Sequence, residues 1–303
     1  MNDKSCADKV IVITGATSGI GRAVALSLGR CGASLALVGR NVRKGEELVR
    51  MIRSDYPDSA AKFFQADISN PTEVRELVSR IMNRYDRIHV LINNAGARFS
   101  QFEETSGGIE RTFATNHLGH FLLTALLLEH LMRAPDARIL TIGSGAHFGV
   151  HCDPIWILTR ETYERKLAYG TSKLANILFA YELARRLSCT SVTSNAVDPG
   201  GVATNLGRNN GVVAWLRHLT YYAWKGQLVT PRHAAGHIAY MVLAKELIGV
   251  TGLYFHERKP VMSSTTSQDL ATARELWSLS VKLTGIDARL GQVWEYMRPA
   301  DSS

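Results

Sequence analysis

Tyr169 and Lys173 are the residues best suited to chemistry, and they stand four positions apart in Ala-Tyr-Gly-Thr-Ser-Lys-Leu-Ala-Asn, within a helix-compatible stretch. That spacing places both side chains on one face of a helix. A tyrosine hydroxyl has an ordinary pKa near ~10, and a nearby ammonium lowers that pKa because it favours the phenolate. The pair can therefore give a proton to a carbonyl oxygen or take one from an alcohol. The same spacing is also common on solvated helices, so this interpretation depends on the rest of the chain.

A glycine-rich turn near the start of the chain is the second chemical feature. Residues 14–21 read Thr-Gly-Ala-Thr-Ser-Gly-Ile-Gly, between the apolar run 9–13 and a helix-compatible segment. Backbone amides and a helix N-terminus at such a turn attract a pyrophosphate. Gly15 permits the tight turn, Gly19 allows close approach of a nucleotide, and Gly21 lets the helix pack on the strand. A plain glycine-rich connection is the alternative, and the flanking strand and helix disfavour it.

The elements that position these residues alternate between short apolar runs and amphipathic segments. Strands are expected at 9–13, 34–39, 62–67, 88–92, 138–142, 191–197 and, as the last strand, 252–255. Helices are expected near 22–28, 42–54, 71–85, 109–132 and 231–247, with one more that contains Tyr169 and ends near 187. This alternation predicts one α/β domain over residues 1–303, a Rossmann-type doubly wound parallel sheet with helices on both faces. Ligands of such sheets bind beyond the carboxyl ends of the strands.

Composition narrows the function classes. The chain has 303 residues, of which 46% are hydrophobic and 20% charged, as in ordinary globular proteins. The net charge is +8, but the basic residues are spread along the chain and no nucleic-acid-binding module accompanies them. We therefore expect no nucleic-acid partner, and part of the positive charge can serve an anionic cofactor phosphate.

The compartment is expected to be the cytoplasm. The four cysteines show no paired spacing, which favours a reducing environment. The polar start has no signal-peptide core, and the apolar stretch 118–128 is too short to span a bilayer. We expect no transmembrane segment.

Taken together, the motifs resemble the short-chain dehydrogenase/reductase superfamily over nearly the whole chain. The resemblance is carried by TGATSGIG at 14–21, Asp67 after the third strand, NNAG at 93–96, Asn116 in TNHLGH, Ser144 in IGSGAH, YGTSK at 169–173, and Pro199-Gly200. Within the superfamily the chain is most similar to the retinol dehydrogenase group, through YGTSKLANILF, the long loop between Ser144 and Tyr169, and the tail ELWSLSVKLTG. Many members of that group carry an N-terminal membrane segment, and we expect none here. The chain also has Gly143 where many relatives have serine, and Asp198 where the group usually has histidine.

The resemblance implies roles for four catalytic residues. Tyr169 acts as general acid in reduction and as base in oxidation, while Lys173 lowers its pKa and binds the nicotinamide ribose. Ser144 orients the carbonyl oxygen, and Asn116 holds a proton-relay water near Lys173. A hydride that reaches a carbonyl carbon leaves charge on the oxygen, which needs a donor already in place. Taken singly, Ser144 reads as a turn residue and Asn116 as a polar helix contact.

The resemblance also implies a set of cofactor contacts. Asp67 accepts from the adenine amino group, and Thr204 binds the carboxamide. Asn93, Ala95 and Gly96 steady the strand ends and face the adenosine ribose. A capping or turn role is the alternative for each of these residues. The full predicted set is Gly15, Thr17, Ser18, Gly19, Ile20, Gly21, Arg40, Asp67, Ile68, Asn93, Ala95, Gly96, Tyr169, Lys173, Pro199, Gly200, Val202 and Thr204.

Arg40, at the end of the second strand, indicates which nucleotide is bound. An acidic residue there would bind the ribose 2′-hydroxyl of NAD, whereas an arginine suits the 2′-phosphate of NADP. Arg43 and Lys44, one turn further on, can assist. We therefore expect NADP(H) rather than NAD(H), although three solvated charges at the start of a helix are the plain alternative.

The function predicted is an NADP(H)-dependent oxidoreductase that interconverts a carbonyl and an alcohol. Two alternatives remain at this stage: reduction of an imine or activated double bond at the same site, and a dinucleotide-sensing binding protein without turnover. All of the predicted catalytic residues are present, which disfavours the second alternative.

Two irregular segments are expected to shape the substrate pocket, a substrate loop near 148–168 and a lid near 205–230. They carry the candidate substrate contacts Trp156, Trp215 and Trp224. Apolar residues recur in the lid with partly helical spacing, so a bulky, apolar carbonyl or alcohol substrate is expected. Packing against the body of the fold, against a second subunit in a homo-oligomer, or on a membrane surface are the alternatives. The loop residues His147, His151, Cys152 and Asp153 have no paired motif elsewhere, and no metal site is expected.

Overall fold

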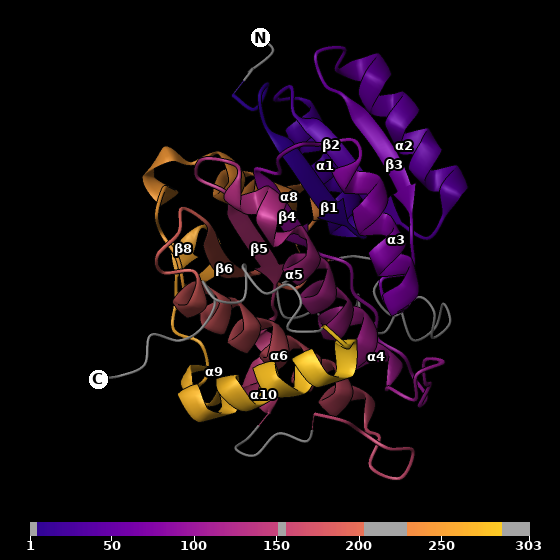
Figure 1. Ribbon diagram of the computed structural model, residues 1–303, viewed down its shortest axis with the longest axis vertical. Helices are drawn as coiled ribbons and strands as arrows, with labels where there is room; N and C mark the ends of the chain where they lie inside the picture. Colours follow the sequence, from indigo (N-terminus) through magenta and orange to yellow (C-terminus); the bar gives the residue numbers. More distant parts are fainter. Residues whose placement is uncertain (1–4, 151–155, 203–228, 287–303) are drawn as a thin grey trace.

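The computed structural model describes residues 5–150, 156–202 and 229–286 (Figure 1). Within these ranges eight strands form one sheet in the order β3-β2-β1-β4-β5-β6-β7-β8. The strands are β1 Val10–Thr14, β2 Ser34–Gly39, β3 Ala61–Gln65, β4 Val90–Asn93, β5 Arg138–Ile142, β6 Thr193–Asp198, β7 Tyr254–His256 and β8 Lys259–Pro260. All neighbouring pairs from β3 to β7 are parallel, and the order reverses at β1 and β4. The doubly wound α/β fold is thereby confirmed.

Helices cover both faces of the sheet. On one face, α1 Gly19–Gly29, α2 Val42–Asp55 and α8 Pro231–Leu243 share a core cluster with the strands. On the other face, α3 Pro71–Met82, α5 Gly119–Met132 and α6 Arg165–Arg186 form a second cluster. Neighbouring residues of β1 divide between them, since Ile11 and Ile13 lie in the first cluster and Val12 in the second. This explains why the strands read as unbroken apolar runs, because both faces are buried.

The helical zone expected at 109–132 is not one uniform helix. It consists of α4 Arg111–Phe113, a π-helical turn η1 Ala114–Leu118, and α5. The wide turn is shown by the N–H of Gly119, which donates to the carbonyl of Ala114 five residues earlier. Single π turns are rare inside α-helices, and those that occur often lie at functional sites.

The expectation that residues 252–255 form the last strand is wrong. Glu257 and Arg258 have φ angles of 47° and 69°, so the chain reverses after β7 and adds the short antiparallel strand β8. Two consecutive left-handed residues make the tight reversal of a two-residue hairpin. The short helices η2 Gly145–Gly149, η4 Lys245–Leu247 and α9 Thr265–Gln268 complete this part of the fold.

The helix α10 Leu270–Thr284 was not expected from the sequence pattern. It packs with α9 beside α6, at the yellow end of the colour scale in Figure 1. Its Trp277 is buried against Phe121 and Phe179, and the guanidinium of Arg186 lies 4.3 Å from the centroid of the indole. No helix within the described ranges is long and apolar enough to cross a membrane.

Candidate functional site

A cavity of about 1150 Å³ opens at the carboxyl ends of the strands. Most of the predicted cofactor residues line it, namely Gly15, Thr17, Ser18, Gly19, Ile20, Gly21, Arg40, Asp67, Ile68, Ala95, Gly96, Tyr169, Lys173, Pro199, Gly200 and Val202. These residues come from six segments of the chain that meet at one surface, as expected for a doubly wound sheet.

The glycine-rich turn has the backbone that its sequence predicts. Gly15 and Gly19 have φ angles of 66° and 53°, which side-chain-bearing residues rarely adopt. A Cβ atom on Gly21 would lie 2.4 Å from the carbonyl oxygen of Gly15. The hydroxyl of Thr14 accepts hydrogen bonds from the amides of Asn94 and Ala95, both at 2.9 Å. The turn and the 93–96 motif are therefore built against each other.

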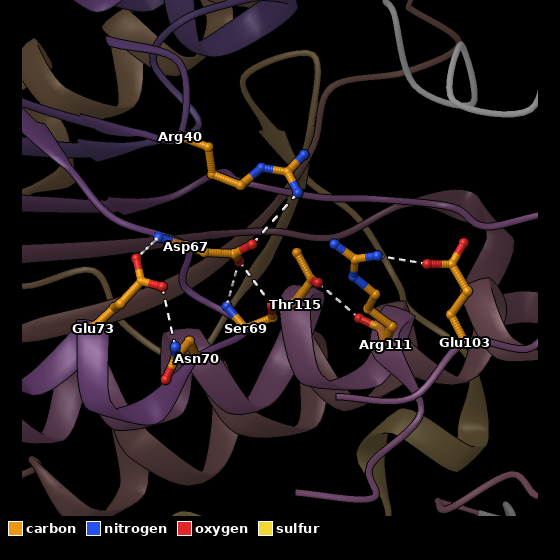
Figure 2. Close-up of polar contacts among 8 residues, drawn as sticks. All are labelled: Arg40, Asp67, Ser69, Asn70, Glu73, Glu103, Arg111 and Thr115. Atoms are coloured by element: carbon orange, nitrogen blue, oxygen red, sulfur yellow. Dashed lines mark hydrogen bonds and ion pairs between the residues drawn. The ribbon is translucent and has the colours of Figure 1, made fainter. Parts of the chain in front are cut away.

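Arg40 and Asp67, which both line the cavity, face each other (Figure 2), and Arg40 Nη1 lies 3.5 Å from Asp67 Oδ2. The other carboxylate oxygen of Asp67 accepts from the amide and the hydroxyl of Ser69 at 3.0 and 2.7 Å. Although partial burial acts to raise it, the pKa of Asp67 is lowered by these hydrogen bonds and by the guanidinium of Arg40. Asn41 and Lys44 line the same part of the cavity, and the Asn41 side chain caps α2 by accepting from the Lys44 amide. Two cationic side chains therefore stand beside the start of α2.

Asn93 lies elsewhere than expected. Its side chain is fully buried, and Nδ2 donates to the hydroxyls of Thr124 and Thr141, away from the cavity wall. Successive side chains of a strand point to opposite faces, so the neighbouring Asn94 reaches the cavity in its place. The Nδ2 of Asn94 donates to the carbonyl of Thr14 at 2.7 Å.

Asn116 lies on the π-helical turn η1 and is fully buried. Its side chain brackets Ala97: Oδ1 accepts from the Ala97 amide at 2.7 Å, and Nδ2 donates to the Ala97 carbonyl at 3.0 Å. The same Nδ2 donates to the hydroxyl of Ser172, which in turn donates to the carbonyl of Tyr169. Asn116 thus joins the segment after the 93–96 motif to the start of the helix that carries Tyr169 and Lys173.

Tyr169 and Lys173 lie one turn apart on α6, and both line the cavity. Lys173 is 3% exposed; its ammonium donates to the carbonyl of Ile142 at 2.9 Å and lies 5.7 Å from the centroid of the Tyr169 ring. Burial lowers the pKa of Lys173 to about 8, while the carboxylate of Asp198 acts in the opposite direction. The guanidinium of Arg98 lies 5.5 Å from the same tyrosine ring. Two cationic groups therefore lie near the ring of Tyr169.

Ser144 follows β5 and lines the same cavity as Tyr169. It begins η2, and its hydroxyl accepts from the amide of Ala146 at 3.2 Å. Before it stands Gly143, where a Cβ would lie 3.2 Å from the ring of Tyr254. Gly143, which stands where many relatives have serine, thus leaves room for the ring of Tyr254.

Asp198, where the retinol dehydrogenase group usually has histidine, ends β6 behind the cavity wall. One carboxylate oxygen accepts from the hydroxyl of Tyr254 at 2.9 Å, and the other accepts from the amide of Gly200 at 2.9 Å. Burial and the adjacent carboxylate raise the pKa of Tyr254. Asp198 therefore fixes the turn at Pro199-Gly200 and places a negative charge near Lys173.

Several residues of the cavity wall were missed in the sequence. They include Asn94, Arg98, Thr115, Glu164, Lys166 and Leu167. Lys166 precedes Tyr169 by three positions, so helical spacing could have identified it. Arg98 carries no such signal, because it stands in an irregular segment that the side chain of Asn116 and the hydroxyl of Tyr163 hold at Ala97 and Phe99.

The predicted substrate contacts are only partly described. Trp156 does not line the cavity; it is 6% exposed and packs in a cluster with Phe113 and Leu174. This supports the alternative that this part of the substrate loop packs against the body of the fold. Thr204, Trp215, Trp224, nearly all of the lid, and His151, Cys152 and Asp153 lie outside the described residues.

His147, the one described residue of the group considered for a metal, has both ring nitrogens engaged. Both ring nitrogens of His147 are hydrogen bonded, to the carbonyl of Ser144 and to the amide of Ser264. Elsewhere in the described ranges His233, His237 and Glu257 lie within 4.8 Å of one another, but the Nδ1 of His237 already accepts from Arg258. A guanidinium at that position disfavours a metal cation.

Comparison with known proteins decides the family. The model of the family described as short chain dehydrogenase matches residues 9–212. The chain belongs to this family of oxidoreductases. Its members bind a nicotinamide dinucleotide, and the cavity described above has the glycine turn and cationic groups that such a ligand needs.

The curated relatives include retinol dehydrogenases. Mouse retinol dehydrogenase 12 is 37% identical over 278 residues, which cover 92% of this chain and 87% of the relative. Human retinol dehydrogenase 13 is also 37% identical, covering 92% and 86%. A chloroplastic short-chain dehydrogenase, TIC 32 B of Brassica napus, is 37% identical over 90% of this chain and 87% of its own length.

Solved structures agree with the fold. A protein from Mycobacterium paratuberculosis is 30% identical, with a TM-score of 0.70 and coverage of 92% of this chain and 94% of its own. The RhlG protein of Pseudomonas aeruginosa, solved as an NADP complex, is 22% identical, with a TM-score of 0.69 and coverage of 88% and 99%.

Proposed function

We propose that this protein is an NADP(H)-dependent oxidoreductase that interconverts a carbonyl and an alcohol on a bulky apolar substrate. The proposal is carried by one observation: Tyr169, Lys173 and Ser144 line the same cavity as the glycine turn at 14–21. The hydroxyl of Tyr169 acts as general acid in reduction, and the hydroxyl of Ser144 orients the carbonyl oxygen. The ammonium of Lys173 favours the phenolate that remains after the proton has left.

The cavity supports a phosphorylated dinucleotide. Gly15, Gly19 and Gly21 leave the backbone accessible at the start of α1, where a pyrophosphate would be held. Arg40 and Lys44 provide two cations for a 2′-phosphate, beside the N-terminus of α2. The nicotinamide of bound NADPH supplies the hydride, and the residues of the protein bind, orient and move the proton.

In this proposal Asn116 and Lys173 support the proton transfer by Tyr169. The buried Asn116 side chain bonds Ala97 and Ser172, so it joins the segment after the 93–96 motif to the helix that carries Tyr169. The ammonium of Lys173 donates to the carbonyl of Ile142, and this hydrogen bond keeps its positive charge near the ring of Tyr169. Preorganised donors of this kind stabilise charge that develops in the transition state.

The substrate class rests on the relatives and on the lid composition. Relatives at 37% identity are named retinol dehydrogenases, which supports a bulky apolar alcohol or aldehyde. The lid near 205–230 carries Trp215 and Trp224, and we propose that these side chains contact the apolar part of the substrate. Trp156 is left out of this proposal because it packs in the core.

The test is a turnover screen of the whole protein with NADPH and NADH. Retinal and other bulky apolar aldehydes or ketones are compared with small polar carbonyls, an imine and an activated double bond. We expect the highest kcat/KM for a bulky apolar carbonyl with NADPH. Preference for small polar carbonyls or NADH would refute that part of the proposal. Tight NADPH binding without turnover across the whole panel would favour a dinucleotide-sensing protein.

A further inference from the structure

Two buried histidines hold the main-chain carbonyls of two predicted catalytic residues. His120, on α5, is 1% exposed, and its Nδ1 lies 2.9 Å from the carbonyl oxygen of Asn116. His147, on η2, is fully buried, and its Nδ1 lies 2.7 Å from the carbonyl oxygen of Ser144. A carbonyl oxygen can only accept, so Nδ1 carries the hydrogen in both rings.

The opposite nitrogen confirms the tautomer of His147. Its Nε2 lies 3.0 Å from the amide of Ser264, and an amide can only donate. The ring is therefore neutral, with hydrogen on Nδ1 alone. Ser264 begins α9, where its hydroxyl accepts from Ser267. His147 thus ties the turn at Ser144 to the segment that follows β8.

His120 has the same arrangement. Since Nδ1 donates, Nε2 must accept, and the hydroxyl of Thr14 lies 2.9 Å from it. That hydroxyl already accepts from the amides of Asn94 and Ala95, so it cannot also accept from His120. Its single hydrogen is within reach of Nε2 of His120 at 2.9 Å and of the Ile92 carbonyl at 3.3 Å. His120 therefore connects the end of β1, at the glycine turn, with the π-helical turn that holds Asn116.

The contact between His120 and the Asn116 carbonyl spans the boundary between the π turn and α5. In a regular α-helix the Asn116 carbonyl would accept from the amide four residues later, which belongs to His120. In η1 the register widens to five residues, as the bond from Gly119 to Ala114 shows. The imidazole of His120 supplies a donor at this carbonyl, and it does so from the same residue whose amide a regular helix would use.

We propose that His120 and His147 are positioning residues for the reaction, each holding one element of the catalytic machinery through a neutral imidazole with its hydrogen on Nδ1. His120 positions Asn116, and His147 positions Ser144. This inference rests on the proposed function for its kinetic consequences, while the tautomers themselves do not depend on turnover. Neither ring lines the cavity, so neither is expected to contact substrate or cofactor.

The first experiment reads the tautomers directly, by ¹⁵N NMR of the imidazole rings in the intact protein near neutral pH. Spectra of the His120→Asn and His147→Asn variants assign the two signals among the ten histidines. We expect both rings to be neutral with hydrogen on Nδ1. A ring that is charged or carries its hydrogen on Nε2 would overturn the proposal for that residue, whatever the activity of the protein.

The second experiment separates the two ring nitrogens. The amide of asparagine occupies the place of Nδ1, and that of glutamine reaches toward the place of Nε2. We expect His120→Asn and His147→Asn to keep most of kcat, and the glutamine variants to lose about 3- to 10-fold in kcat with little change in NADPH affinity. Equal kcat in the asparagine and glutamine variants would overturn the positioning role.

A matched control comes from His130, which is also buried on α5 but lies ten residues beyond His120. His130→Asn and His130→Gln should leave kcat and the substrate KM unchanged. If these changes lower kcat as much as those at His120, the effect is one of general packing and the positioning role is refuted. Absence of turnover in the wild-type protein would refute the proposed function and leave the tautomer result standing.

Discussion

The ammonium of Lys173 and the carbonyl of Ile142 are joined by a 2.9 Å hydrogen bond, and the side-chain amide of Asn176 donates to the same carbonyl at 3.0 Å. The charge of a flexible side chain is thereby fixed at the end of β5. Of the three proposed catalytic residues Tyr169, Lys173 and Ser144, it is Tyr169 whose hydroxyl gives up its proton in the direction of reduction.

Replacing Tyr169 with phenylalanine should abolish turnover and keep cofactor binding. The change removes one hydroxyl, and loss of a general acid–base group lowers kcat by about 10²- to 10⁴-fold. The measurement is kcat together with NADPH affinity from protein fluorescence. A variant that turns over at close to the wild-type rate would show that another group supplies the proton.

Replacing Arg40 should change the choice of nucleotide. Arg40→Asp removes a charge-assisted contact to the 2′-phosphate, which should weaken NADPH binding by about 1.5–3 kcal/mol before any new repulsion. Arg43→Asp is the matched control, since Arg43 is also exposed but does not line the cavity. Titration with NADPH and NADH measures both affinities, and equal effects of the two substitutions would contradict a specific contact.

Replacing Asp198 with asparagine should shift the alkaline limit of activity to lower pH. Burial lowers the pKa of Lys173 to about 8, and the carboxylate of Asp198 opposes this. Without that charge the pKa of Lys173 falls further, so the ammonium loses its proton at lower pH. The pH dependence of kcat in the two proteins checks this, and unchanged profiles would mean that the ammonium does not control the reaction.

Acid should destabilise the fold below about pH 6.5, partly through His117. Burial and the neighbouring His120 lower the pKa of His117 to about 3, so between pH 6.5 and about 3 the unfolded chain binds more protons and the free energy of unfolding falls as pH falls. His117→Phe should remove a slope of up to about 1.4 kcal/mol per pH unit. Urea unfolding at several pH values measures it. Phe113→Leu alters the same cluster without a titratable group, and it should keep the wild-type slope.

Replacing Gly119 with alanine should destabilise the protein. A Cβ there would lie 2.0 Å from the carbonyl oxygen of Ile68, so α5 would have to move away from the segment after β3. Overpacking of this kind costs about 1–3 kcal/mol. Gly107→Ala is the control, because its nearest neighbour would be 3.8 Å away. Equal midpoints of denaturant unfolding in the two variants would show that the helix adjusts without cost.

Strands and helices of the sheet region could be predicted because their patterns repeat locally. The segments 34–39 and 138–142 were predicted with the bounds that β2 and β5 have. The π turn could not be predicted, since it depends on how Asn116 and His120 meet Ala97 and Thr14 in space. β8 was missed because its two residues are exposed and polar or proline, without an apolar signal.

The candidate site was predicted best where a motif has a fixed spacing. Asn93 does not line the cavity whereas the next residue, Asn94, does, and the sequence does not decide which of two successive side chains faces the cavity. Trp156 was placed wrongly because a loop tryptophan looks the same in sequence whether it faces a ligand or a core. Arg98 lines the cavity through an irregular segment that distant residues hold. The two histidines contact carbonyls only three and four residues away, but their other ring nitrogens meet Thr14 and Ser264 from distant segments.

The hairpin that ends the sheet also limits how it can grow. An exposed strand edge offers unpaired amides and carbonyls on which another chain can add a strand. At this edge β8 has only Lys259 and Pro260, so a proline without an N–H and a lysine charge replace a long open ladder. Aggregation through strand addition is thereby disfavoured at this end of the sheet. At the other end the five-residue strand β3, with its exposed Lys62, is the edge on which another chain could more easily add a strand.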